Sequence, residues 1–234
     1  MIIYHDLGNM DFKEAWDYQV KVFSERVENK LENRKKPDNE SNYLEDLLLF
    51  VEHPHVYTLG KSGKDDNLLI NDKFLDKINA TYYHIDRGGD ITYHGPGQIV
   101  GYPVFDLDHF GIHLKQYVHA IEECIIIFLD EAGIMASRME GATGVWIEPG
   151  KPNARKICAI GVKASRFITM HGFAFNINTD LKYFNYINPC GFTDKGVTSL
   201  QKELGYRQDM DAVKNSLKEI FINYFYNIKS EIVK

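Results

Sequence analysis

The sequence contains neither of the two common phosphate-binding loops. Across its 234 residues there is no GxxxxGK[ST] loop and no GxGxxG that opens a helix, which argues against nucleotide binding by either device. Its three cysteines, Cys124, Cys158 and Cys190, show no CxxC spacing, so neither a disulfide framework nor a zinc site is indicated. We therefore expect reduced thiols and no metal or other cofactor.

Long apolar runs and basic charge are also scarce. No apolar run approaches the roughly 20 residues that span a bilayer, and the start, MIIYHDLGNMDFKEAW, lacks the basic and apolar regions of a signal peptide. The formal net charge is -6, whereas a nucleic-acid partner requires a basic surface. We therefore expect a cytoplasmic protein that has no membrane or nucleic-acid partner.

The composition does supply enough apolar sequence for one core. Hydrophobic residues make up 44% and charged residues 26% of the chain, as in soluble globular proteins, and the length fits a single domain, 1–234. The helical period occurs at 11–33, 114–132 and 210–228, and strand-like runs occur at 43–51, 82–85, 99–105, 143–148, 156–162 and 173–178. Because no regular βαβ rhythm appears, we predict an α+β fold with a mixed or antiparallel sheet flanked by helices. The polar run 31–42 is interpreted as a solvated helix end and loop.

The segment RGGDITYHGPGQ, residues 87–98, is rich in glycine and lies between two strand-like runs. Glycine lets a ligand approach the backbone amides closely, because no Cβ is in the way. A hairpin that needs glycine only for its own turns is the alternative interpretation. Since the phosphate-binding loops are absent, a weakly polar ligand such as an acyl carbonyl fits this loop better than a nucleotide.

Cys190 is the best candidate for a nucleophile. It lies in the loop-like sequence INPCGF, whereas Cys124 falls in a helical pattern and Cys158 in a strand-like one, where cysteine is usually a small buried hydrophobe. A thiol with the ordinary pKa of about 8.5 needs a nearby cation or base to become a thiolate at neutral pH. The residues alone do not indicate which cation this is.

Several motifs together resemble the octanoyltransferases of lipoate synthesis, also called lipoate-protein ligase B, in the biotin/lipoate ligase-like superfamily. They occur in the family's order between about residues 45 and 200. They are EHPHVYTLG (52–60), RGGDITYHGPGQIVGY (87–102), TGVWI (143–147), RKICAIGVK (155–163), HGFAFNIN (171–178) and NPCG (188–191). The resemblance implies a catalytic domain with the biotin/lipoate-protein ligase fold.

The resemblance also implies a reaction. Cys190 and Lys156 would be catalytic, with the octanoyl group passing from octanoyl-acyl carrier protein to a cysteine thioester. From there it would pass to a lysine of the lipoyl domains of 2-oxoacid dehydrogenases and the glycine-cleavage protein. The family's substrate positions correspond to Arg87, Gly88, Gly89, Asp90, Ile91, Thr92, Tyr93, His94, Ala159, Ile160, Gly161, Gly172, Phe173 and Ala174. Backbone amides of these glycines would stabilise the developing oxyanion.

Histidines and surface cations near these motifs give further expectations. His94 and His171 are candidates for hydrogen bonds at the site, whereas His53 and His55 are expected to be loop residues without chemistry. Acyl carrier proteins are acidic, so their docking on a chain of net negative charge requires a local positive patch. The residues suggested for such a patch are Lys151, Arg155, Lys163 and Arg166.

Three alternatives remain open. An ATP-dependent lipoate- or biotin-type protein ligase would use a lysine without a cysteine nucleophile, and NPCG argues against it. An octanoyl amidotransferase between lipoyl domains would also use a cysteine, and Lys156 in KICAIG favours the carrier-protein enzyme instead. A catalytically inactive acyl-binding module would not need both Cys190 and Lys156.

Overall fold

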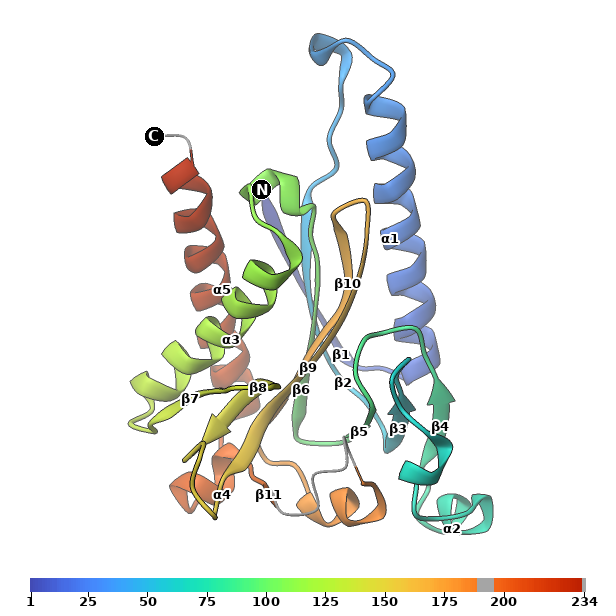
Figure 1. Ribbon diagram of the computed structural model, residues 1–234, viewed down its shortest axis with the longest axis vertical. Coiled ribbons are helices and arrows are strands. Elements are labelled where there is room, and N and C mark those ends of the chain that lie inside the picture. The colour runs from blue at the N-terminus through green and yellow to red at the C-terminus, as the bar shows by residue number, and fades with distance from the viewer. Residues whose placement is uncertain (189–195, 233–234) are drawn as a thin grey trace.

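The computed structural model describes residues 1–188 and 196–232, and an eight-stranded mixed sheet forms its centre (Figure 1). The strand order is β1-β2-β6-β10-β9-β8-β7, with β11 beside β9. The strands are β1 (Ile2–Asn9), β2 (Asp46–Glu52), β6 (Gln98–Val104), β7 (Ala136–Met139), β8 (Ala142–Ile147), β9 (Arg155–Ser165), β10 (Ile168–Asn176) and β11 (Gly196–Val197). The pairs β1–β2 and β9–β11 are parallel and the others antiparallel, which confirms the predicted mixed sheet.

A second sheet has three strands in the order β4-β3-β5. They are β3 (Val56–Leu59), β4 (Thr81–His84) and β5 (Ile91–His94). The expectation of one continuous loop at 87–98 was therefore wrong, because β5 lies within it. Ile91 and Tyr93 alternate with more polar residues and pack on Tyr57 and Leu59, so this part of the segment has the period of a half-buried strand.

Three long helices flank the large sheet, close to the predicted bounds. They are α1 (Phe12–Asn33), α3 (Leu114–Glu131) and α5 (Met210–Ile232), and the short helices are α2 (Asp72–Lys77), α4 (Leu200–Leu204), η1 (Asp38–Glu40), η2 (Asp65–Asn67), η3 (Leu107–Phe110) and η4 (Leu181–Tyr186). In Figure 1, α3 and α5 lie together on one side of the sheet and α1 on the other. Among the residues described, no helix combines the length and apolar composition that a membrane span needs.

The two faces of the large sheet are packed differently. On the α3 and α5 side the core is continuous, and Phe173 stacks on Phe221 with ring centroids 5.1 Å apart. On the other side, Phe23 of α1 belongs to a smaller cluster with Tyr102 and Met170. Because α1 covers only part of this face, the rest is available for a site.

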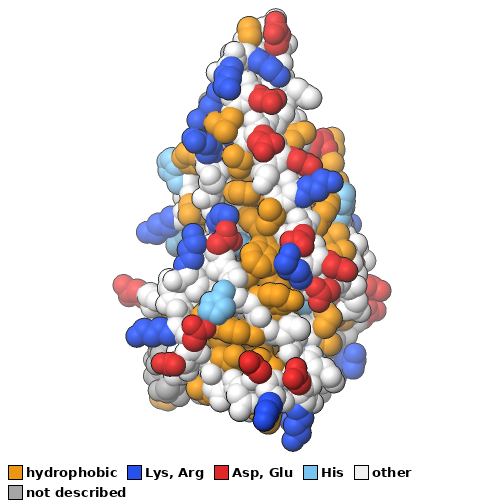
Figure 2. Space-filling model, turned by 90° about the vertical axis from the view of Figure 1, so that its right-hand side faces the viewer, with side chains coloured by type: hydrophobic (Ala, Val, Ile, Leu, Met, Phe, Trp, Pro, Cys, Tyr) orange, Lys and Arg blue, Asp and Glu red, His pale blue; other side chains and the backbone are white. Residues whose placement is uncertain are grey.

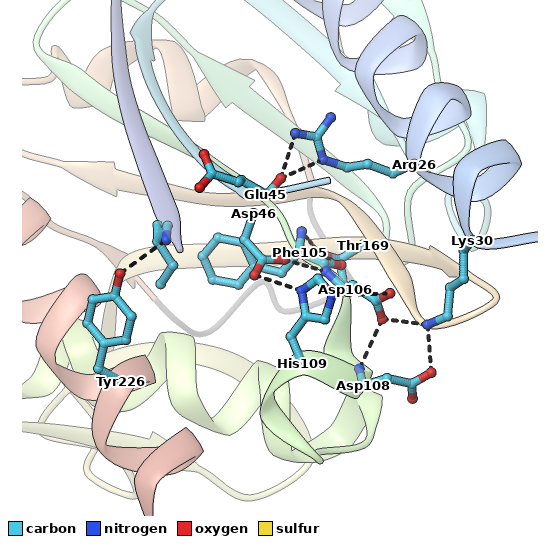
Figure 3. A network of polar contacts seen from close by, with 11 residues as sticks. Arg26, Lys30, Glu45, Asp46, Phe105, Asp106, Asp108, His109, Thr169 and Tyr226 are labelled. Carbon is cyan, nitrogen blue, oxygen red and sulfur yellow. Dashed lines mark hydrogen bonds and ion pairs between the residues drawn. The ribbon is translucent and has the colours of Figure 1, made fainter. Parts of the chain in front are cut away.

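A buried ion pair between Lys30 and Asp106, extended by the exposed carboxylate of Asp108, attaches the C-terminal half of α1 to the sheet (Figure 3). The Lys30 ammonium contacts the carboxylates of Asp106 and Asp108, the latter at 2.6 Å. Asp46 accepts the backbone N–H of Asp106 at 2.7 Å and contacts Nδ1 of His109 at 3.0 Å. We call Lys30, Asp46, Asp106, Asp108 and His109 the Lys30 cluster. It positions the helix by charge rather than by apolar contact alone.

The polar run 31–42 is less solvated than its composition suggests. Asn33 is buried, with 4% of its surface exposed. Its side-chain amide donates to the carbonyl of Asn42 at 2.9 Å and accepts the Asn42 N–H at 3.2 Å. The prediction of a solvated helix end was therefore wrong at Asn33, because its side chain closes the loop that returns to β2.

Candidate active site

A cavity of about 580 Å³ opens between β6, β9 and β10 of the large sheet, the segment 85–94 and the start of α1. Its volume is in the range of small-molecule sites. The predicted site residues that line it are Lys156, Arg87, Gly88, Gly89, Asp90, Ile91, Thr92, His94, Ala159, Ile160, Gly161, Gly172, Phe173 and Ala174. Motifs far apart in the sequence therefore meet at one cavity.

Tyr93 is the predicted binding residue that does not line this cavity. Its ring stacks on Tyr183 with centroids 4.9 Å apart, and its hydroxyl oxygen is hydrogen-bonded to Nδ1 of His55 at 2.7 Å. Successive strand residues point to opposite faces, so Thr92 and His94 can face the cavity while Tyr93 packs behind β5. Tyr93 holds the small sheet together, and His55 contributes to the same packing.

Small residues form the floor of the cavity. Ala159 pairs with Ala174 and Gly161 pairs with Gly172 across β9 and β10, which leaves a trough between bulkier neighbours. A Cβ on Gly161 would lie 2.9 Å from the Gly88 carbonyl oxygen, so the 87–89 segment rests directly on β9. This close approach explains why glycine is needed at position 161.

Arg87 organises the glycine-rich segment from inside. Its guanidinium is buried and donates to the Thr58 carbonyl at 2.8 Å and to the Thr58 hydroxyl at 3.0 Å. It also donates to the Gly88 carbonyl at 3.0 Å. Such bonds between a charged donor and backbone acceptors fix the segment against β3 and the cavity floor.

A buried chain of hydrogen bonds runs from the glycine-rich segment to Lys156. His94 donates from Nδ1 to the Gln98 side chain at 2.8 Å, and Gln98 donates to the Asn176 side chain at 2.9 Å. Asn176 donates to the Thr198 carbonyl at 3.0 Å, and the Thr198 N–H donates to the Lys156 carbonyl at 2.9 Å. We call His94, Gln98, Asn176 and Thr198 the amide chain. It connects β5, β6 and β10 with β11 beside Lys156.

Two histidines in this wall are neutral. His53 donates from Nδ1 to the Met10 carbonyl and accepts from the Tyr102 hydroxyl, each at 2.8 Å. Burial lowers the pKa of His53 to about 4. Burial and the neighbouring His53 lower the pKa of His94 to about 3. His53 is thus a buried residue that supports the cavity wall through Tyr102, whereas the sequence predicted only a loop histidine.

His171, on β10, lines the end of the cavity that is far from Lys156. Its Nε2 lies 3.0 Å from an Asp86 oxygen, and Lys163 contacts the same carboxylate. The hydrogen bond from His171, followed by Lys163, holds the pKa of Asp86 well below its usual range. His171 pairs with Val162, so at about 3.3 Å per strand residue it lies some 20 Å from Lys156 along the strand.

A β-bulge directs Lys156 toward the cavity. Val145 pairs with Cys158 but the next residue, Trp146, pairs with Lys156, so β9 has one extra residue, Ile157. Ile157 and Cys158 consequently both pack in the α3 and α5 core, although neighbouring strand residues normally face opposite ways. The bulge moves Lys156 to the opposite face from that core. There its ammonium donates to the Thr143 carbonyl at 3.0 Å and lies 4.7 Å from the centre of the Trp146 ring.

Two of the three cysteines are buried, as the sequence suggested for them. Cys124 and Cys158 are fully buried, and burial raises the pKa of both thiols. Neither is therefore a thiolate in the folded protein at neutral pH. Cys190, the predicted nucleophile, lies outside the described residues. Within the described ranges, no three histidine, cysteine or carboxylate side chains are arranged to hold a metal ion.

The predicted positive patch is largely neutralised by carboxylates. Lys151 lies 3.2 Å from Glu148, and Arg155 contacts Glu148 at 2.7 Å and Glu203 at 2.6 Å. Lys163 is paired with Asp86. On the face shown in Figure 2, acidic and basic side chains are likewise interspersed around an apolar band. Lys151, Arg155 and Lys163 therefore offer less net positive charge than the sequence suggested.

Residues that were not among the predicted catalytic and substrate-binding positions complete the cavity wall. They are Phe12, Ile85, Gln98, Val100, Tyr102, Val118, Gly141, Ala142, Thr143, Trp146, Val162, His171, Asn176, Phe184, Gly196 and Val197, with His171 considered only as a hydrogen-bonding candidate. Trp146 and Asn176 lie inside recognised motifs, TGVWI and HGFAFNIN. Their position within these motifs, rather than their residue type, was therefore the feature of the sequence that could have identified them as cavity residues.

Solved structures resemble this fold at low sequence identity. A bi-partite lipoate protein ligase from Thermoplasma acidophilum matches with a TM-score of 0.65 and 14% identity, over 99% of this chain and 90% of that one. A biotin protein ligase from Aquifex aeolicus, in complex with biotin and ATP, matches with a TM-score of 0.54 and 12% identity, over 98% and 72%. These similarities confirm the predicted fold class.

The sequence itself belongs to the lipoyl protein ligase A/B catalytic domain family, whose model matches residues 11–222. An octanoyltransferase from Parabacteroides distasonis is 56% identical over 95% of this chain and 97% of its own length. An octanoyltransferase from Cytophaga hutchinsonii is 54% identical over 92% of this chain and 89% of its own. The resemblance drawn from the motifs is confirmed, and with it the prediction of an acyltransferase.

Proposed function

We propose that this protein transfers an octanoyl group from an acyl carrier protein to a lysine of lipoyl domains, through a thioester on Cys190. One observation carries the proposal: Lys156 lines the same cavity as every predicted binding residue except Tyr93. The octanoyltransferase relatives, at 54 to 56% identity, support the choice of acyl group. The ligases of similar fold, at 12 to 14% identity, support no particular activity.

The trough of small residues suits an alkyl chain. Ala159, Gly161 and Ala174 leave width for methylene groups, and each methylene removed from water contributes about 0.8 kcal/mol. With the thioester carbonyl near Lys156, the chain would extend along β9 toward Gly161. The polar groups of the wall are bonded to one another, so an apolar chain would leave few of them unsatisfied.

In the first half-reaction, the Cys190 thiolate attacks the thioester carbonyl. A carbon–sulfur bond forms to Cys190, and the bond to the pantetheine sulfur breaks. The Lys156 ammonium gives its proton to the departing thiolate, which leaves Lys156 neutral. A lysine beside a thiol is suited to this exchange, because its proton is readily shared with such a partner.

In the second half-reaction, the neutral amine of the acceptor lysine attacks the acyl-enzyme. The new carbon–nitrogen bond gives an amide, the bond to Cys190 breaks, and Lys156 takes up the proton released by the amine. The thiolate and the ammonium are thereby restored. No ATP is consumed, because an amide is more stable than a thioester, and two separate half-reactions predict ping-pong kinetics.

Intact-protein mass spectrometry after incubation with octanoyl-acyl carrier protein tests the proposal. We expect an octanoyl adduct on the wild type that hydroxylamine releases and that is absent from Cys190→Ser and Lys156→Ala. Octanoylation of a lipoyl domain without an adduct on the wild type would indicate direct attack by the acceptor amine and would contradict it. An adduct formed only from an octanoylated lipoyl domain would identify an amidotransferase instead.

A further inference from the structure

The proposed mechanism gives no role to Trp146, which is 2% exposed and lies beside Lys156. The β-bulge at Ile157 makes the two residues direct partners across β8 and β9. In a regular ladder, Trp146 would pair with Ile157 and Lys156 would point into the apolar core. The same irregularity therefore brings the indole and the ammonium onto one face, where both line the cavity.

The indole is held in place by its own hydrogen bond. Its Nε1–H donates to the Ala142 carbonyl at 3.0 Å, which fixes the ring plane beneath Lys156. The ammonium lies 4.7 Å from the ring centre and 3.0 Å from the Thr143 carbonyl oxygen. An aromatic face attracts a cation, and a carbonyl accepts from it, so both contacts favour the charged form of Lys156 in this orientation.

Among the residues that the structure describes, the charged side chains on the elements next to Lys156 form ion pairs with one another. On the opposite side of β8, Glu122 of α3 accepts the Gly144 N–H at 2.9 Å and pairs with Arg138 of β7 at 2.9 Å. On β9 itself, Arg155 pairs with Glu203 of α4 and with Glu148. The titratable neighbour on β9, Cys158, faces the apolar core. These charges belong to fixed pairs, whereas Trp146 directly contacts the ammonium.

We propose that Trp146 is a positioning residue, which keeps the Lys156 side chain charged and directed into the cavity where the thiolate of the reaction needs a cation. This inference rests on the proposed function, because it presupposes a lysine that acts with a thiol. It predicts that a less negative indole face, at unchanged ring shape, reduces the extent to which Lys156 lowers the pKa of that thiol.

Fluorinated tryptophans provide the test, because fluorine withdraws charge from the ring face and leaves its shape nearly unchanged. The chain has two tryptophans, and Trp16 does not line the cavity, so a Trp16→Phe protein would carry the analogue only at position 146. The readout is the pH dependence of iodoacetamide alkylation of the full chain, followed by intact mass, with Cys190→Ser as background. Lys156→Met gives the full effect of losing the cation.

We expect Lys156→Met to move the apparent thiol pKa up toward the ordinary value of about 8.5. Increasing fluorination of Trp146 should raise the apparent thiol pKa progressively, by about half a pKa unit to one pKa unit in total. Trp146→Leu should raise this pKa by a similar amount. No movement across the fluorinated series, while Lys156→Met does shift the pKa, would overturn the role of Trp146. A thiol pKa unaffected by Lys156→Met would instead contradict the proposed thiol–lysine pair.

Discussion

The Lys30 cluster and the amide chain both bury polar groups, but they do so with opposite chemistry. The first consists of ion pairs, in which Lys30 contacts two carboxylates while His109 lies against a third (Figure 3). The second consists of neutral amides, a hydroxyl-bearing residue and His94, whose pKa is lowered to about 3. One region keeps its charges paired, and the other contains none at neutral pH.

Because of this difference, we expect substitutions in the two regions to affect different properties, stability in one and acyl transfer in the other. Buried ion pairs are costly to break, because the remaining partner is left charged and unpaired, so the Lys30 cluster should mainly affect folding. His53 and His94 add no cation to the cavity wall, whose described arginine and lysine side chains are Arg87 and Lys156. A neutral scaffold does not compete with Lys156 for an anion, so changes there should mainly affect acyl transfer.

Lys156→Met should have the largest effect on activity. Removing a group that both gives and accepts the proton is expected to slow octanoyl transfer roughly 10²- to 10⁴-fold. The melting temperature should change little, because the side chain is only half-buried. Rates of lipoyl-domain octanoylation and thermal melting would be measured together, with the exposed Lys151→Met as control. A loss of rate that parallels a loss of folded protein would contradict a catalytic role.

Lys30→Met should have the opposite effect to Lys156→Met, lowering stability and leaving the transfer rate of the folded protein nearly unchanged. It leaves the buried carboxylate of Asp106 without its cation, which is expected to cost about 3 kcal/mol of unfolding free energy, while the transfer rate of the folded protein stays close to that of the wild type. Urea unfolding of the variant and the wild type measures this difference in the free energy of unfolding. Lys13→Met is the matched control, because its pair with Asp17 is exposed on the same helix and should contribute less than about 1 kcal/mol. Equal costs for the two variants would argue against the Lys30 cluster as a stabilising element.

Asn176→Leu should lower both the stability of the fold and the rate of octanoyl transfer. It removes a donor from the Thr198 carbonyl and an acceptor from Gln98, which is expected to cost about 1 to 3 kcal/mol of stability. Because the residue after β11 then loses one of its two backbone hydrogen bonds beside Lys156, transfer should slow by roughly tenfold or more.

Asn33→Leu provides the comparison for Asn176→Leu. Asn33 is equally buried but closes the loop at the end of α1, so its loss should lower stability without slowing the folded enzyme. Kinetics at matched folded fractions would distinguish the two variants. Similar rates for both would show that the amide chain supports the fold alone.

Local pattern predicted much of the fold but little of the cavity wall. The helical period identified α1, α3 and α5, because each buries one continuous stripe. The bulge at Ile157 has no such signal, since it depends on how β8 pairs with β9. The bond between Gln98 and Asn176 joins residues 78 positions apart, so neither amide is distinguishable from a surface residue by its type or local pattern. Motif resemblance found Lys156, but only the paired strands explain its direction.

The pH dependence of stability should give the smallest effect. His53 has a folded pKa of about 4 against an ordinary 6.5, so between these values the unfolded chain binds more protons, and stability falls as the pH drops through that window. From pH 7 to 5.5, His53 should account for about 1 kcal/mol of the loss. Urea unfolding at both pH values would show a smaller loss in His53→Gln, with the exposed His119→Gln as control. An undiminished loss in His53→Gln would contradict a buried, neutral His53, and would assign the acid sensitivity in this window to other groups such as His94, whose pKa of about 3 predicts a loss of similar size.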